Sequence, residues 1–131
     1  MAEQVNEWFL GEVELGGHNW EVHGFRGTEQ FYEGPACLGY CHYDRQRIGL
    51  CLFHSKGFPV PSSSVDSTFL HEVLHALMFY ARITPEDEEE AVKRLELITF
   101  PFLMANAPGF FHELYARWDW PDEYVLALES E

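Results

Sequence analysis

The sequence predicts an α+β fold in which N-terminal antiparallel hairpins form a small sheet, followed by a long helix and one or two further helices. Three observations predict it. The first half alternates apolar and polar residues around turn signals, the second half spaces its apolar residues as helices do, and a segment rich in proline and serine separates the halves. The chain has 131 residues, 47% of them hydrophobic, which suffices for one core. We therefore expect one domain over residues 1–131.

Two hairpins are predicted in the first half. In GEVELGGHNWEVHGF, alternating apolar residues stand on both sides of the turn signal Gly16-Gly17, and in CLGYCHYDRQRIGLCLFH two apolar segments flank a polar turn at residues 44–47. The last strand has an aliphatic residue at every second position, which predicts the inward-facing set Ile48, Leu50 and Leu52. The following KGFPVPSSS, residues 56–64, is predicted to be a loop.

The second half is predicted to be helical. STFLHEVLHALMFYAR, residues 67–82, is apolar around most of its circumference, which predicts a buried central helix capped by Asp66 or Ser67. TPED at residues 84–87 gives the next helix a capping hydroxyl on Thr84, a proline at its first position and early acidic residues. The predicted inner face of that helix is Ala91, Val92, Leu95, Ile98 and Thr99.

Two breaks are expected beyond this point. Pro101 is expected to kink or end the second helix, and NAPG at residues 106–109 separates it from a short helix in FFHELYARW. The tail PDEYVLALESE fits either a strand or a frayed end.

Composition restricts the function classes. The formal net charge is −14, with 8 basic residues against 22 acidic ones, which argues against nucleic-acid binding because phosphate contacts need clusters of Lys and Arg. No run of about 18 apolar residues and no basic segment ahead of an apolar one occurs, so we expect neither a membrane span nor a signal peptide. The protein is expected to be cytoplasmic, and its three cysteines, Cys37, Cys41 and Cys51, to be reduced thiols.

The pattern that carries chemistry is LHEVLH in the central helix. His71 and His75 are four residues apart, which places both imidazoles on one helix face within reach of a single Zn²⁺. Glu72 completes an HExxH arrangement, in which the glutamate acts as general base toward the water that the metal activates. Burying these groups without partners would cost on the order of several kcal/mol, so the pattern favours metal binding over a structural histidine pair.

Zinc needs a third protein ligand, and EEE at residues 88–90 supplies the candidates. Glu88 shares the phase of the predicted inner face, Glu90 points outward, and Glu89 lies between them. Phase therefore favours Glu88 as the ligand and leaves Glu89 as the alternative. Weaker candidates are spread along the chain: His42, Cys51, His54, Asp66 and His112.

Some further polar residues have more than one interpretation. Cys37 and Cys41 have the spacing CxxxC without a second pair, which is more typical of buried structural thiols than of a metal site. A group that stabilises an oxyanion opposite the metal could come from any of three residues, between which the sequence does not choose: His54, Tyr80 and Tyr115.

Residues 38–108 resemble the small HExxH metallopeptidase-like proteins of bacteriophages and prophages, which are related to the ImmA/IrrE group of zincins. The strands GYCHYDRQRIGLCL, the motif LHEVLHALM and the helix EEEAVKRL carry the resemblance. In the ImmA/IrrE group, Gly often precedes the second histidine and another His follows it four residues later, where this chain has Leu74 and Phe79. EEEAV also stands in place of that group's EAN-type signature.

The resemblance implies a minimal zincin-like fold, with a small twisted sheet, an active-site helix bearing HExxH, and a following helix whose acidic residue completes the zinc site. It implies that His71, His75 and one of Glu88 and Glu89 hold the zinc, with Glu72 as general base. It also implies a zinc metallopeptidase, which would act in the host cytoplasm if a phage encodes it.

Two functions follow as hypotheses. The first is zinc-dependent hydrolysis of a peptide or protein substrate, basic or neutral in view of the chain's charge, that pairs as a strand with the edge of RIGLCLF. The second is a non-catalytic, metal-stabilised acidic interaction protein, such as a phage anti-defence or inhibitor protein. Substitution of Glu72 separates them, because only the first needs a general base.

Overall fold

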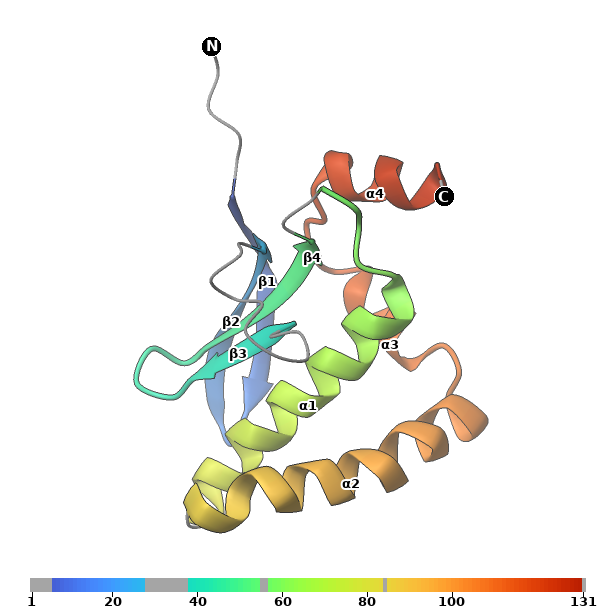
Figure 1. Ribbon diagram of the computed structural model, residues 1–131. Helices are drawn as coiled ribbons and strands as arrows, with labels where there is room; N and C mark the ends of the chain where they lie inside the picture. Colours follow the sequence, from blue (N-terminus) through green and yellow to red (C-terminus); the bar gives the residue numbers. More distant parts are fainter. Residues whose placement is uncertain (1–5, 28–37, 55–56, 84, 131) are drawn as a thin grey trace.

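The sheet of the computed structural model has four strands in the order β1-β2-β4-β3 (Figure 1). β1 (Glu7–Leu15) and β2 (His18–Arg26) form one antiparallel hairpin, and β3 (Gly39–His42) and β4 (Arg47–Phe53) form the other. The structure describes residues 6–27, 38–54, 57–83 and 85–130, and the count of strands refers to them. The α+β fold class and both predicted hairpins are confirmed, although the second turn closes one residue early because Arg47 already belongs to β4.

The two hairpins are joined by parallel pairing of β2 with β4, which the sequence did not predict. β4 is therefore an inner strand, and it is buried on both faces: Ile48, Leu50 and Leu52 on the predicted side, Cys51 and Phe53 on the other. The expectation that a substrate pairs with the RIGLCLF strand is wrong, because β2 and β3 occupy both edges of β4.

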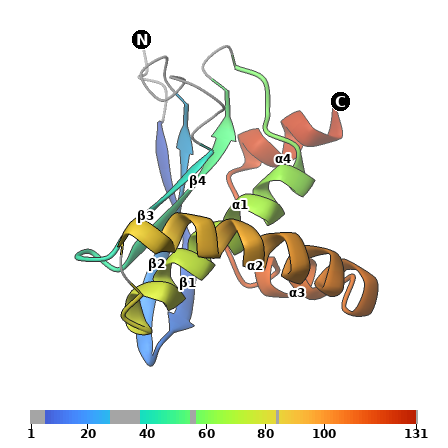
Figure 2. The same ribbon diagram turned by 60° about the horizontal axis from the view of Figure 1, so that its bottom comes forward.

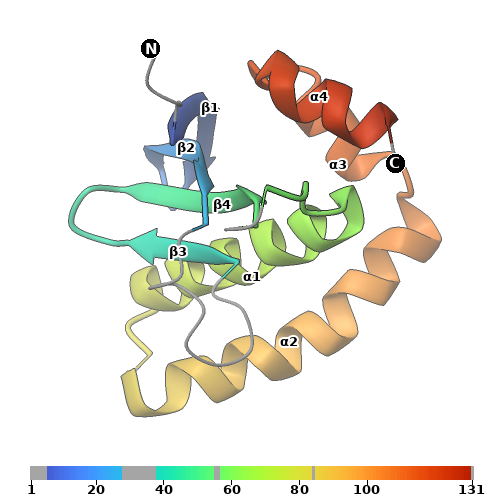
Figure 3. The ribbon, with the colours of Figure 1, turned by 45° about the horizontal axis from the view of Figure 1, so that its top comes forward.

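Helix α1 (Ser62–Tyr80) crosses one face of the sheet, and α2 (Pro85–Asn106) packs along the outer side of α1, so α1 is the predicted central helix (Figure 2). Two short helices, α3 (Phe110–Tyr115) and α4 (Asp122–Glu129), lie near the N-terminal end of α1 (Figure 3). The tail is thus helical over α4, which corrects the expectation of a strand or a frayed end. None of the described helices is long and apolar enough to cross a membrane.

The start of α1 differs from the prediction. The helix begins at Ser62 with Pro61 at the N-cap position, so the preceding loop is shorter than expected, and Asp66 and Ser67 lie inside the helix instead of capping it. Val65 explains the earlier start, because its side chain is 2% exposed and anchors the first turn in the core. The predicted cap of α2, Thr84, lies outside the described residues, and α2 begins at Pro85 as predicted.

The inner face of α2 was predicted only in part. Val92 is fully buried, whereas Ile98 is 71% exposed and Leu95 is also exposed. The helix turns Glu88 and Glu96 inward with Val92 because this face covers the polar side chains of α1, so apolar residues do not mark it. Pro101 does not end the helix, which continues to Asn106 before the predicted break.

Candidate metal centre

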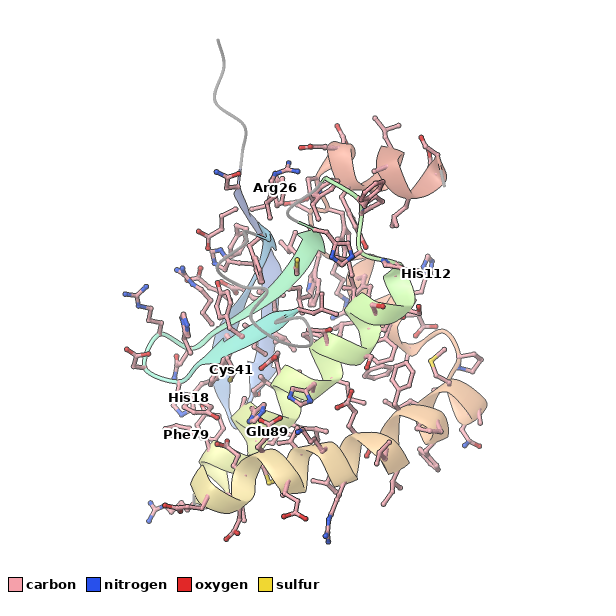
Figure 4. The ribbon with its side chains drawn as sticks, viewed as in Figure 1. His18, Arg26, Cys41, Phe79, Glu89 and His112 are labelled. Carbon is pink, nitrogen blue, oxygen red and sulfur yellow. The ribbon has the colours of Figure 1, made fainter. Side chains whose placement is uncertain are left out.

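The C-terminal half of α1 and the first turns of α2 bring two imidazoles and a carboxylate together. The Nε2 atoms of His71 and His75 are 3.2 Å apart. The carboxylate oxygens of Glu89 lie 3.4 Å from Nε2 of His71 and 2.8 Å from Nε2 of His75. Figure 4 shows Glu89 between α2 and α1, on the side of α1 near Cys41. One ligand atom from each of the three residues lies within 4.8 Å of the others, which makes them a candidate metal centre.

Helical geometry accounts for the meeting of these side chains. A four-residue spacing stacks His71 and His75 one turn apart on the same face of α1, as the sequence predicted. The chain then turns back, so that the first turns of α2 face the last turns of α1 (Figure 1). This reversal carries Glu88 and Glu89 to the two histidines.

Each histidine has a carboxylate behind its other ring nitrogen. Nδ1 of His71 lies 2.8 Å from Glu96, whose second oxygen accepts a 2.8 Å hydrogen bond from the Ser67 hydroxyl. Nδ1 of His75 lies 3.5 Å from Glu88. A carboxylate at Nδ1 holds the imidazole proton there, which leaves the Nε2 lone pair free for a metal.

The geometry at the centre fits a zinc ion. Two Nε2 lone pairs and a carboxylate repel one another unless a proton or a metal cation lies among them. A tetrahedral zinc with ligand distances of about 2.0–2.1 Å would hold its ligand atoms about 3.3 Å apart. In the structure the two Nε2 atoms are 3.2 Å apart, one oxygen of Glu89 lies 2.8 Å from Nε2 of His75, and its other oxygen lies 3.4 Å from Nε2 of His71. Two imidazoles and a carboxylate, with a fourth position left for water or substrate, form the donor set of several catalytic zinc sites.

Glu88 and Glu89 divide two roles between them. Glu88 points inward as its phase predicted, with its side chain 13% exposed, but it lies beside Nδ1 of His75 and accepts a 2.6 Å hydrogen bond from the Tyr43 hydroxyl. Glu89, 52% exposed, reaches both Nε2 atoms from the rim. Glu90 points outward and pairs with Arg94. The structure therefore places Glu89 at the centre and Glu88 behind His75.

Glu72 lies buried beneath β3, with 8% of its surface exposed. Burial raises the pKa of its carboxyl to about 7; His71 lowers it, and Glu89 and Glu96 raise it. A Cβ on Gly39 would lie 2.5 Å from the Thr68 methyl group and 3.1 Å from Oε2 of Glu72. The missing side chain at Gly39 thus lets β3 pass close over this carboxylate.

Cys41 lies on β3 near the same carboxylates. Burial raises the pKa of its thiol to about 12, and the negative charges of Glu72 and Glu88 raise it as well. The thiol is therefore protonated at neutral pH, as expected for a structural cysteine. Cys37, its partner in the CxxxC pattern, lies outside the described residues.

The weaker candidates lie elsewhere. The thiol of Cys51 is buried and lies 3.2 Å from the carbonyl of Phe53, and the hydroxyl of Tyr80 accepts a 2.9 Å hydrogen bond from the Trp20 indole. The others are spread over several elements: His42 at the end of β3, His54 after β4, Asp66 on α1, and His112 and Tyr115 on α3. Among the described residues, none of these side chains joins the candidate metal centre.

The sequence analysis did not identify three residues that make polar contacts at the centre: Ser67, Glu96 and Tyr43. The inward position of Glu96 could have been predicted, because it lies four residues after Val92 and eight after Glu88 on one face of the helix. An acidic residue that continues an inward-facing stripe predicts a buried polar partner. No local pattern could have predicted the role of Tyr43, since its contact with Glu88 spans 45 residues.

Comparison of the chain with protein-family models, curated protein sequences and solved structures finds no match. The resemblance to the phage and ImmA/IrrE zincins therefore stays a prediction.

Proposed function

We propose that the protein is a zinc-dependent peptidase whose metal is held by His71, His75 and Glu89. The observation that carries the proposal is the convergence of three donor atoms, with a carboxylate behind each imidazole. Zinc bound there supplies a Lewis acid that polarises a peptide carbonyl and makes water a nucleophile at neutral pH. Glu88 and Glu96 hold the two imidazoles in the orientation that this binding needs.

Glu72 serves as the general base. It follows His71 directly in the sequence, and its carboxylate is confined between α1 and β3 by the approach of Gly39. In its ionised form, Glu72 accepts a proton from the attacking water and delivers it to the leaving amine. Its burial keeps bulk water away from the proton that is transferred.

The substrate is an extended peptide segment that pairs with β3. Among the described strands, β3 has β4 as its one neighbour and stands at the edge of the sheet, where a further strand can be added. β3 also passes over Glu72, so a peptide added to this edge would run past the candidate metal centre. The net charge of −14 favours a basic or neutral segment.

Cleavage of a mixture of basic and neutral peptides, followed by mass spectrometry, tests the proposal. We expect zinc-loaded wild type to release products and Glu72→Gln to release them at least about 100-fold more slowly, because a general base contributes that much or more. Glu72→Gln should keep the zinc content and the fold. Glu90→Gln is the matched control, since Glu90 points away from the centre, and it should cleave as wild type does.

Two outcomes would contradict the peptidase. Equal cleavage by Glu72→Gln and wild type would remove Glu72 from the mechanism. No cleavage by wild type that carries stoichiometric zinc would favour instead the non-catalytic protein in which the metal only stabilises the fold.

A further inference from the structure

A second candidate site lies at the other end of α1. A cavity of about 460 Å³ opens between the first turn of α1 and the two short helices α3 and α4. Ser62 at its edge is nine residues before His71, which is about 14 Å along a helix. In Figure 4, His112 marks this end of the molecule and Glu89 the end with the candidate metal centre. The cavity is therefore separate from the proposed active site.

The first turn of α4 is held in place by two polar contacts, and this leaves the cavity open beside the rest of the helix. The Tyr124 hydroxyl donates a 2.7 Å hydrogen bond to the carbonyl of Val60, and Glu123 pairs with Arg26 at 2.8 Å. These contacts set the position of α4 without packing its whole length against α1. Val125 and Leu128 consequently line the open space.

Aromatic rings form much of the wall. The ring centroids of Tyr115 and Trp120 lie 5.1 Å apart with their planes at 64°, and those of Trp120 and Tyr124 lie 5.9 Å apart at 27°. The indole N–H of Trp120 donates to the Tyr115 carbonyl, and the Tyr124 hydroxyl donates to Val60. Because these two donors are already bonded, the cavity offers apolar surface and π faces, and such faces attract cations.

The described lining of the cavity has two titratable side chains besides its tyrosines, His112 and Glu129. Among the described residues that line it, Glu129 is acidic and none is Lys or Arg. The whole chain carries −14, so the long-range field also attracts positive ligands. A volume of about 460 Å³ falls within the range of sites for small organic molecules, which runs from about 300 to 1,000 Å³.

We propose that this cavity binds a small organic cation with an apolar or aromatic body. The body lies against Val65, Val125 and the aromatic wall, and the cationic group lies at the mouth beside Glu129. The site needs no metal and does not depend on the proposed peptidase activity.

Three probes of matched shape test the proposal on the full chain. They are 2-phenylethylammonium, the neutral 2-phenylethanol and the anionic 3-phenylpropanoate, titrated by calorimetry and by NMR of the tryptophan indole N–H signals. We expect the cation to bind about fivefold more tightly than the alcohol, and the anion to bind most weakly, since cation–π and charge contacts together contribute on that scale. Glu129→Gln should reduce this preference, and His71→Ala should leave it unchanged.

A blocking variant locates the site. Val125→Trp should fill the cavity and abolish binding of the cation, whereas Leu126→Trp, one residue on at a position 61% exposed, should bind as wild type does. Circular dichroism checks that Val125→Trp folds, and Glu129→Gln tests the charge at an exposed position where folding is not at risk. Equal affinity for all three probes, no saturable binding of the cation, or undiminished binding to folded Val125→Trp would overturn the proposal.

Discussion

His71 and Glu96 are joined through the ring nitrogen that faces away from the candidate metal centre, with Nδ1 2.8 Å from the carboxylate. Glu96 is held in turn by the Ser67 hydroxyl, which lies one helical turn before His71 on α1. The contact ties the orientation of an α1 imidazole to the packing of α2. Metal affinity should therefore depend on a residue that is not itself a ligand.

Replacing Glu96 tests this dependence. Glu96→Ala should weaken zinc binding by about 10- to 100-fold, because removal of the carboxylate behind a histidine ligand has an effect of that size. Competition with a chromophoric chelator measures the affinity. Glu90→Ala is the control, since that side chain is 69% exposed and pairs with Arg94, and it should bind zinc like wild type. Unchanged affinity in Glu96→Ala would show that Glu96 does not support His71.

Glu88 and Glu89 should differ in their effect on zinc. Glu89→Ala removes a proposed ligand and should abolish stoichiometric binding, whereas Glu88→Ala should weaken binding by about 10- to 100-fold through the loss of support for His75. Affinities of the two purified variants, measured side by side, provide the check. The reverse order would restore Glu88 as the ligand that its helical phase suggested.

Gly39 should be intolerant of any side chain. Gly39→Ala would place its Cβ 2.9 Å from the carbonyl oxygen of Gly49 and 2.5 Å from the Thr68 methyl group, so β3 must move away from α1. We expect a loss of about 1–3 kcal/mol in the free energy of unfolding, measured with urea. Gly109→Ala is the control, because its Cβ would meet its nearest neighbour only at 3.9 Å. Equal stability of the two variants would contradict the close approach of β3.

The packing of α2 on α1 predicts a contrast between two aliphatic residues. Val92→Ala should lower the free energy of unfolding by about 2 kcal/mol, because Val92 is fully buried. Ile98→Ala should change it by less than about 0.5 kcal/mol, since Ile98 is 71% exposed. Urea unfolding of both variants measures the difference. A larger loss for Ile98→Ala would mean that the helix is rotated from the position in the structure.

The charge of Asp66 should make stability depend on pH. Burial raises the pKa of this carboxyl above its ordinary value of 3.8, and the polar influence of the Tyr115 hydroxyl partly offsets the shift. The folded state then holds the proton more tightly than the unfolded state, so stability is lost as pH rises through the folded pKa. Asp66→Asn should be more stable than wild type at pH 7, with the gap closing below pH 3.8. Denaturation across pH, with the exposed Glu12→Gln as control, should show no such gap for the control.

Local patterns were enough to predict the hairpins, the order of strands and helices as far as α3, and the meeting of His71 with His75. Each of these depends on residues close in sequence, through a turn signal or a four-residue helical spacing. The parallel pairing of β2 with β4 joins segments about 25 residues apart along the chain, and no local pattern specifies it. For that reason the pairing of a substrate was predicted at β4, which is an inner strand, instead of at β3, which stands at the edge of the described sheet.

The inner face of α2 was misjudged because apolar periodicity assumes an apolar partner. Over the histidines of α1 the partner is polar, so the inward positions include Glu88 and Glu96, and Ile98 is left exposed. The same phase placed Glu88 inward correctly, but it did not predict that a neighbour on the rim, Glu89, would extend to the Nε2 atoms. Helical phase gives the direction of a Cβ; the reach of a flexible carboxylate depends on the distance between the helices.

The zinc content of the purified, untagged chain tests the central claim most directly. Elemental analysis should find one zinc per chain in wild type, none in His71→Ala, and none in Glu89→Ala after dialysis against a weak chelator. All three proteins should remain folded by circular dichroism, so that loss of metal is not a consequence of unfolding. Wild type that stays free of zinc after growth and purification with added zinc would contradict the metal centre, and with it the proposed peptidase.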